Sequence, residues 1–334
     1  MALIGAGNFA TATLIPAMKK CHDVSLVGIC SAGGLSARSA AGRHGFAYCT
    51  SDYQELLNDE RIHAVVIATR HDTHARFTVD ALRAGKHVFV EKPLALTVEQ
   101  LDEVIAAREA AGRIVMAGYN RRFSPLSIAV RDFFAQRTGP IEVLCRVNAG
   151  AIAGDSWYQD GEEGGWRIIS EGCHFVDLIQ FICGCAPAEV FADMVGGAIA
   201  GGQNDNCAVT LKMTDGSLGT LIYVANGDSH LEKERVEAFG QGRAAVIENW
   251  SIARLSTGGR IRKVKPSGTG KGHGLEMAEF VRAVRDGREP SLTFDDAVAC
   301  TLATFATVRS LASKRSQQCH LERDASATAA AVGV

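Results

Sequence analysis

The chain has 334 residues, of which 47% are hydrophobic and 22% charged, with a formal net charge of −2. This length fits two domains of ordinary size better than one. The near-neutral charge gives no reason to expect nucleic acid or a membrane surface as partner, and no apolar run is long enough to span a bilayer. Ten cysteines without metal-ligand spacing favour a reduced, cytoplasmic setting and no metal site.

The chain opens with a short apolar strand, a glycine-rich turn and a helix over residues 11–20. The turn matches the fingerprint of a dinucleotide-binding fold, with alanine as the third small residue. Glycines permit a tight turn and close approach of a pyrophosphate, while the small third residue lets helix and strand pack. Because the strand begins almost at residue 1, the chain is expected to be part of a longer polypeptide. The expected cofactor contacts here are Gly5, Gly7, Asn8, Phe9 and Ala10.

A second strand is expected over residues 24–30. Ser31 follows it, at the position where an NAD-type site would carry an acidic residue for the adenosine ribose. The Ser31 hydroxyl could bond either a ribose hydroxyl or a phosphate. Arg38 could neutralise a 2′-phosphate. The sequence therefore leaves open whether the cofactor is NAD(H) or NADP(H).

Strands over residues 63–68, 88–90 and 114–117 alternate with helices over 75–84 and 98–111. This alternation predicts a parallel sheet with right-handed crossovers. Ligands bind outside the carboxyl ends of such strands. The polar residues expected to contact the cofactor at these ends are Thr69, His71, His74, Glu91 and Lys92.

Lys92 directly follows the strand over residues 88–90 and precedes Pro93. The proline biases Lys92 toward an extended conformation, which stiffens the presentation of its ammonium group. A single lysine in this context is more often a surface ion-pair residue. A catalytic role for Lys92 therefore depends on the motifs around it.

Those motifs occur in a specific order. Gly-x-Gly-x-x-Ala at residues 5–10, Glu-Lys-Pro at 91–93 and Gly-Tyr-Asn-Arg-Arg-Phe at 118–123 together resemble the glucose-fructose oxidoreductase, inositol dehydrogenase and MocA family. The resemblance covers the first 125 residues clearly and the rest less distinctly. It implies an NAD(P)-dependent oxidoreductase with an N-terminal Rossmann domain.

From residue 141 the pattern changes to strands separated by turns, over residues 141–148, 188–195, 207–213, 217–225, 235–240 and 244–249. Hairpin turns between them predict a large, open and mainly antiparallel sheet in an α+β domain. One helix is expected to end near residue 183, and two more are expected over residues 275–286 and 294–313. The expected domains are 1–120, for the cofactor, and 121–334, for substrate and oligomerisation, with a C-terminal helix returning to the first domain and a frayed tail over 324–334.

The segment 164–178 opens a helix that carries His174, and the family resemblance implies that this histidine faces the nicotinamide and Lys92. Family members commonly carry an aspartate four residues earlier, where this chain has Ser170. The departure puts the usual carboxylate in doubt. The residues expected to contact substrate are Tyr119, Asn120, Arg121, Trp166, Arg167, Ser170 and Glu171.

The expected reaction moves a hydride between the nicotinamide and a secondary alcohol or ketone of a sugar, polyol, sugar acid or nucleotide sugar. His174 has an ordinary pKa suited to accepting the alcohol proton, and Lys92 would orient the oxygen, although the two roles could be exchanged. Two alternatives stay open: a lyase or glycoside hydrolase that oxidises its sugar transiently with tightly held NAD, and a non-catalytic cofactor-binding sensor or partner subunit. The resemblance also implies a homodimer or homotetramer.

Overall fold

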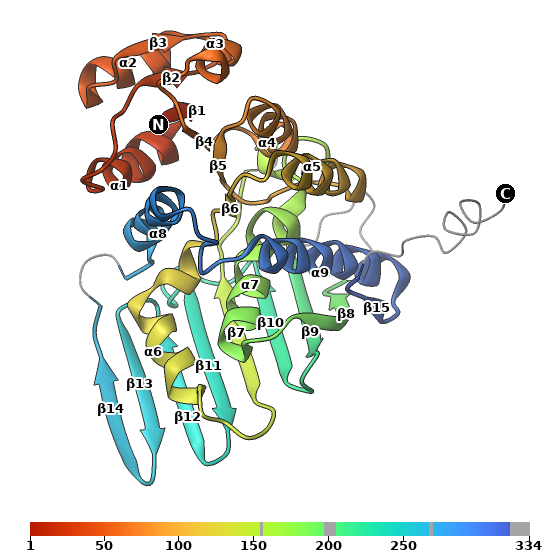
Figure 1. Ribbon diagram of the computed structural model, residues 1–334. Helices are drawn as coiled ribbons and strands as arrows, with labels where there is room; N and C mark the ends of the chain where they lie inside the picture. Colours follow the sequence, from red (N-terminus) through yellow and green to blue (C-terminus); the bar gives the residue numbers. More distant parts are fainter. Residues whose placement is uncertain (154–155, 197–204, 267–269, 321–334) are drawn as a thin grey trace, which may run out of the picture.

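The protein is described here by a computed structural model that covers residues 1–153, 156–196, 205–266 and 270–320. Two sheets organise the chain, one formed by the N-terminal third and one by the remainder (Figure 1). The tail over residues 324–334, expected to fray, lies outside the described residues. No helix in the described ranges is long and apolar enough to cross a membrane.

The first sheet is parallel, as predicted, and has six strands in the order β3-β2-β1-β4-β5-β6. Its central strands are fully apolar and buried, which suits strands covered by helices on both faces. The strands are β1 (Ala2–Ile4), β2 (Gly28–Cys30), β3 (Tyr48–Thr50), β4 (Ala64–Ile67), β5 (His87–Val90) and β6 (Val115–Ala117). The helices between them are α1 (Ile15–Lys19), α2 (Leu35–His44), α3 (Tyr53–Asn58), α4 (His74–Arg83) and α5 (Val98–Ala111).

Several local details differ from the sequence-based expectation. The first helix begins as a π-helical turn, η1 (Ala10–Leu14), and continues as α1, whose second residue is Pro16. The second strand starts at Gly28 rather than at residue 24. Strand β3 was not predicted, because its residues are half-buried or exposed at the sheet edge and form no apolar run.

The second sheet has nine strands in the order β14-β13-β12-β11-β7-β10-β9-β8-β15. Neighbours pair antiparallel with one exception: β7 and β10 run parallel, because the chain passes through a helix and the β8–β9 hairpin between them. The polar sequences of β13, β14 and β15 gave no prediction. The strands are β7 (Glu142–Asn148), β8 (Pro187–Met194), β9 (Asn206–Met213), β10 (Leu218–Val224), β11 (Glu234–Gly240), β12 (Arg243–Glu248), β13 (Ile252–Thr257), β14 (Arg260–Val264) and β15 (Gln317–Gln318).

Helices α6 (Pro125–Phe134), α7 (Cys173–Cys183) and α9 (Phe294–Ser313) lie across one face of the large sheet (Figure 1). Helix α8 (His273–Asp286) instead packs against α1, with Phe280 edge-on to Phe89 of β5 at 5.7 Å. The C-terminal part of the chain therefore contacts the first sheet. The division of the chain at residue 120 stays a prediction.

Candidate active site

The glycine-rich turn after β1 is shaped for close contact with a ligand. Gly5 has a φ of +102°, and a Cβ there would lie 2.2 Å from the carbonyl oxygen of Ala68, so only glycine fits. A Cβ on Gly7 would meet no described atom within 4 Å, which leaves the backbone beside it open. Ala10 is buried under the turn. These features fit the pyrophosphate of a dinucleotide.

Asn8 and Phe9 form the exposed part of this turn. The carbonyl oxygen of Asn8 accepts a hydrogen bond from the Thr11 hydroxyl at 3.2 Å. Phe9 is 43% exposed, and its ring meets the ring of His273 edge-on at 5.7 Å. The start of α8 therefore borders the predicted cofactor turn.

The end of β2 carries no carboxylate between residues 31 and 38. The Ser31 hydroxyl accepts hydrogen bonds from the Ala37 amide at 3.1 Å and the Ser36 hydroxyl at 2.9 Å. Arg38 is exposed and forms no ion pair within the described part of the chain. A 2′-phosphate would meet no carboxylate within residues 31–38, while Asp52 and Glu55 lie near enough to the end of β2 to raise the pKa of Cys30.

The two histidines after β4 bond to the backbone. His71 Nδ1 lies 2.9 Å from the carbonyl oxygen of Gly164, and His74 Nδ1 lies 2.8 Å from that of Pro93. His74 Nε2 also lies 3.3 Å from the Thr69 carbonyl oxygen. Burial lowers the pKa of His71 to about 2 and that of His74 to about 4, so both rings are neutral near pH 7. These bonds join the segment after β4 to Gly164 and to Pro93, the residue that follows Lys92. Neither Nδ1 is free for the cofactor contact that we predicted.

Lys92 leaves the end of β5 and reaches toward the second sheet. Its Nζ donates a hydrogen bond to the Ser170 carbonyl oxygen at 2.7 Å, which joins the parallel sheet to the π-helical turn η5 (Ile168–Gly172) before α7. The Lys92–Pro93 peptide bond is cis. No carboxylate in the described ranges pairs with this ammonium group. The lysine predicted as catalytic is thus held by a neutral acceptor.

Glu91 points the other way, into the interior. It is 7% exposed, and a Cβ on Gly118 would lie 2.9 Å from its carboxylate oxygens, so glycine at 118 makes room for it. Burial raises the pKa of Glu91 to about 7. The carboxyl group of Glu91, which we predicted to contact the cofactor, is therefore buried behind the site.

Glu276 on α8 is a buried acid that sequence reasoning missed. Both of its carboxylate oxygens are buried and have no hydrogen-bond partner among the described residues. Burial, followed by the charge of Glu91, raises its pKa well above the ordinary value. Phe280 of α8 packs on Phe89 of β5, and the charge of Glu91 acts on Glu276, so the two buried carboxyl groups lie near one another. Its position in a charged helical segment gave no signal of burial.

His174 lies in the first turn of α7 and is 7% exposed. Its Nδ1 is buried without a hydrogen-bond partner in the described structure. Burial and the nearby cations Arg121 and Lys92 hold its pKa well below the ordinary value. Its ring meets that of Tyr119 edge-on at 6.2 Å. The imidazole is therefore neutral, and its pKa is lower than the ordinary value that the sequence led us to expect.

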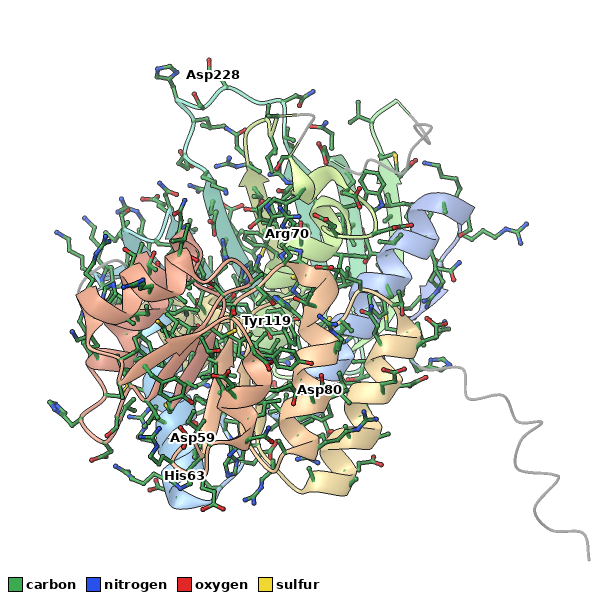
Figure 2. The ribbon with its side chains drawn as sticks, turned by 90° about the horizontal axis from the view of Figure 1, so that it is seen from above. Asp59, His63, Arg70, Asp80, Tyr119 and Asp228 are labelled. Carbon is green, nitrogen blue, oxygen red and sulfur yellow. The ribbon has the colours of Figure 1, made fainter. Side chains whose placement is uncertain are left out.

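Tyr119 is fully buried in the centre of the molecule (Figure 2). Burial raises the pKa of its hydroxyl well above the ordinary value. Tyr119 therefore packs against His174 in the interior, and its side chain does not reach an open surface where substrate could bind. Asn120 is also buried, and its Nδ2 donates to the Lys271 carbonyl oxygen at 2.7 Å.

Arg121 is committed to an interior ion pair. Its guanidinium donates two hydrogen bonds to Glu234, at 2.8 and 2.9 Å, and the side chains of Trp250 and Lys271 donate to the same carboxylate at 2.7 and 3.0 Å. The cations hold the pKa of Glu234 down to about 2 despite burial. The substrate contact predicted for Arg121 would require this pair to open.

Arg167 and Glu171 form a second cluster. Arg167 donates to Glu171 at 3.0 Å and to the Tyr223 hydroxyl at 2.8 Å, and Lys233 Nζ donates to Glu171 at 2.8 Å. These partners lower the pKa of Glu171 to about 2 in spite of its burial, so Glu171 is an anion and no proton acceptor. The cluster holds the turn that presents Ser170.

Ser170 and Trp166 complete the predicted set. Ser170 is fully buried, and its hydroxyl has no hydrogen-bond partner among the described residues. Trp166 is half-buried with a φ of +64°, and its indole packs beside Gly161. The structure thus brings Lys92, Ser170 and His174 together, while Arg121, Arg167 and Glu171 support them.

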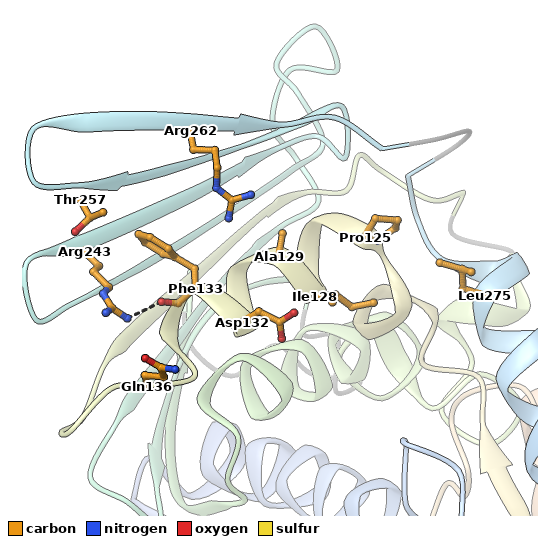
Figure 3. Close-up of a pocket in the computed structure, with 10 residues that line it drawn as sticks. All are labelled: Pro125, Ile128, Ala129, Asp132, Phe133, Gln136, Arg243, Thr257, Arg262 and Leu275. Atoms are coloured by element: carbon orange, nitrogen blue, oxygen red, sulfur yellow. Dashed lines mark hydrogen bonds between the residues drawn. The ribbon is translucent and has the colours of Figure 1, made fainter.

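Two hollows in the described surface are lined by residues outside the predicted site. One of about 680 Å³ lies between α6 and strands β12 to β14, where Arg243 donates to the Phe133 carbonyl oxygen at 2.7 Å (Figure 3). It contains none of the predicted site residues. A second, of about 570 Å³, adjoins Lys233 and is lined by Asn148, Ala149, Gly150, Ser229, His230, Leu231, Glu232, Lys233 and Asn249.

The fold and the glycine turn define a dinucleotide-binding protein with its lysine and histidine at the junction of two sheets. Residues 1–119 match the oxidoreductase family with an NAD-binding Rossmann fold, and residues 140–245 match the GFO/IDH/MocA C-terminal domain. The chain belongs to this family, which confirms the resemblance seen in its motifs. It is an NAD-binding oxidoreductase.

Inositol 2-dehydrogenase of Rhizobium meliloti is 28% identical over 325 residues, which cover 94% of this chain and 97% of the relative. The 4-carboxy-2-hydroxymuconate-6-semialdehyde dehydrogenase of a Sphingobium strain is also 28% identical, with 90% and 95% covered. The solved structure of aldose-aldose oxidoreductase from Caulobacter crescentus superposes with a TM-score of 0.84 at 22% identity, covering 95% of this chain and 98% of that one. The last comparison supports the fold.

Proposed function

We propose that this chain is a dehydrogenase or reductase that transfers a hydride between NAD(H) or NADP(H) and a secondary alcohol or ketone of a carbohydrate-like substrate. The observation that carries the proposal is the position of Lys92, whose Nζ bonds the Ser170 carbonyl oxygen one helical turn from His174. The relative named inositol 2-dehydrogenase supports a polyol or sugar as the substrate class.

His174 is the proton acceptor in this proposal. When an alcohol is oxidised, the hydrogen of its C–H bond leaves as hydride with both bonding electrons, and its O–H proton must go to a base. The lowered pKa of His174 keeps the imidazole neutral, the form that can accept a proton, and its Nδ1 has no hydrogen-bond partner among the described residues. For reduction of a ketone, the same ring returns the proton.

Lys92 orients the substrate oxygen. Its ammonium group has three donors, and one is held by the Ser170 carbonyl oxygen, which leaves others to turn toward an alcohol or a ketone. Such a donor stabilises negative charge that develops on the oxygen as the O–H proton leaves. In the competing assignment, Lys92 accepts the proton and His174 orients the oxygen. The pH–rate profiles of the His174→Gln and Lys92→Met variants separate the two assignments.

The glycine turn would hold the cofactor, with Gly7 opening the backbone to its pyrophosphate and the region around Ser31 and Arg38 meeting its adenosine ribose. When bound, the nicotinamide supplies the hydride acceptor or donor. The protein's part is to place the substrate carbon against it and to handle the proton.

The test is an assay of NAD(P)H absorbance at 340 nm with NAD⁺ or NADP⁺ and a panel of myo-inositol, aldoses and uronic acids. Net accumulation of reduced cofactor with any of them supports the proposal. Turnover of a glycoside without net reduction would favour transient redox chemistry instead. Cofactor binding without any chemistry would favour a sensor or partner subunit.

We also propose that copies of this chain associate through the face of the large sheet opposite α7. Four large apolar side chains on its strands are 39–44% exposed: Phe191, Leu218, Ile222 and Phe239. Burying them in a second copy would stabilise a dimer or tetramer. A monomer by light scattering at micromolar concentration would remove this part of the proposal.

A further inference from the structure

The ion-pair clusters around the active centre contain more cations than anions. One carboxylate, Glu234, accepts hydrogen bonds from both Arg121 and Lys271, so two cations share one anion. Lys271 precedes His273, whose ring meets Phe9 of the glycine turn. Lys271 therefore lies two residues from a contact with the glycine turn.

The second cluster has the same imbalance on the other side of Ser170. Glu171 accepts from both Arg167, at 3.0 Å, and Lys233, at 2.8 Å. Arg167 is buried, at 2% exposure, whereas the Lys233 side chain is 41% exposed. Lys233 is thus the member that a ligand can reach.

No other carboxylate in the described part of the chain forms an ion pair with these four cations. Glu91 and Glu276 lie behind the site, and burial raises the pKa of each, which reduces the negative charge that they carry near pH 7. Asp177 is bonded on both oxygens by Arg122. Lys92 itself bonds only a carbonyl oxygen. The surroundings of His174 are therefore cationic, which agrees with the nearby charges that lower its pKa.

The hollow of about 570 Å³ gives Lys233 an open side. Its one acidic lining residue, Glu232, already receives Arg146 at 2.9 Å. Lys233 reaches Lys92 through two steps only: it bonds Glu171, whose neighbour Ser170 accepts the hydrogen bond from Lys92. Lys92 and Lys233 are therefore both anchored on the turn at residues 170–171, and Lys233 is the one that lines the hollow.

Resting on the function proposed above, we infer that the substrate is an anionic carbohydrate, with a carboxylate received by Lys233 while its reacting alcohol lies between Lys92 and His174. Lys233 is a binding residue in this assignment, because it touches the substrate but not the reacting atoms. Its ammonium group can bond Glu171 and a substrate carboxylate at once, since it has three donors.

The test compares matched sugars that differ only at C6: D-glucose with D-glucuronate, and D-galactose with D-galacturonate. The kcat/KM for NAD(P)⁺ reduction is expected to be at least about tenfold higher for one of the uronates, as one charge-assisted hydrogen bond predicts. Lys233→Met should bring that ratio near one, while Lys233→Arg should keep most of it. Lys263→Met, which removes an exposed lysine on β14, is the matched control and should leave the ratio unchanged.

A loss of rate on sugar and uronate alike in Lys233→Met would show a merely structural role and overturn the inference. Turnover of the neutral sugars with no uronate preference would also overturn it while leaving the proposed function intact. No reduction of cofactor with any compound, in protein that binds the cofactor, would instead contradict the proposed function, and the inference would fall with it.

Discussion

The two sheets hold their cations in different ways. At the end of β5 in the parallel sheet, Lys92 bonds a single neutral oxygen and keeps donors to spare. Beside the antiparallel sheet, Arg121 is fixed by two hydrogen bonds to Glu234 and is 6% exposed. An unpaired charge at a strand end is available for chemistry, whereas paired and buried charges stabilise the structure around it. Each prediction below tests one side of this contrast.

The largest expected effect is on the chemical step. His174→Gln removes the proton acceptor and should lower kcat by about 10² to 10⁴-fold. Because the variant keeps a polar side chain of similar size, cofactor affinity and the unfolding temperature should change little. Steady-state kinetics and a thermal shift with NADH measure both. Near-normal kcat would show that the proton goes elsewhere.

Arg121→Met tests the structural side. Breaking a buried ion pair leaves Glu234 short of a partner and typically costs about 3 to 5 kcal/mol in the free energy of unfolding. Denaturant unfolding measures this, and Arg131→Met, which removes an exposed pair with Asp132, is the matched control with little expected effect. A stable Arg121→Met protein with a raised substrate KM alone would place Arg121 in the substrate site.

Glu276→Gln should change stability in a pH-dependent way. The raised pKa keeps Glu276 protonated in the folded state while the unfolded chain ionises, so wild-type stability falls as pH rises above the ordinary glutamate value. The amide removes that loss, so the variant should gain a few degrees in Tm at pH 8 and little at pH 4.5.

Glu279→Gln provides a control of opposite sign, on the same helix. Arg288 and Arg282 lower the pKa of Glu279 to about 2, so its ion pairs stabilise the fold at neutral pH and are lost as pH falls toward that value. Its amide variant should lose stability at pH 8. An equal Tm change for Glu276→Gln at both pH values would contradict the account of a buried protonated acid.

The smallest effect concerns the choice of cofactor. If Arg38 receives a 2′-phosphate, Arg38→Ala should raise the KM for NADP⁺ by about tenfold and leave that for NAD⁺ unchanged, since one charge-assisted hydrogen bond is lost. Ser31→Asp should disfavour NADP⁺ by placing a carboxylate at the end of β2. Equal KM changes for both cofactors would remove Arg38 from the cofactor site.

The sequence predicted what depends on local pattern. Apolar runs located β4 and β5, and strand ends pointed to Lys92, because in a parallel sheet these ends meet at one edge. The edge strand β14, with its exposed Arg-Ile-Arg-Lys-Val, has no such pattern and was missed.

Partners far apart in the chain could not be predicted. Arg121 and Glu234 are separated by 113 positions, and Lys92 and Ser170 by 78. Nothing in the sequence around Arg121 distinguishes a guanidinium that binds substrate from one locked on an interior carboxylate. Burial of Glu276 likewise depends on how α8 packs against β5.

The most direct measurement is the absorbance at 340 nm of wild type and Lys92→Met, side by side, with cofactor and the best substrate from the panel. The account predicts steady formation of reduced cofactor by the wild type and a loss of at least about 10²-fold in the variant, which should still bind NADH. Turnover by Lys92→Met close to that of the wild type would contradict the central claim that the end of β5 carries the chemistry.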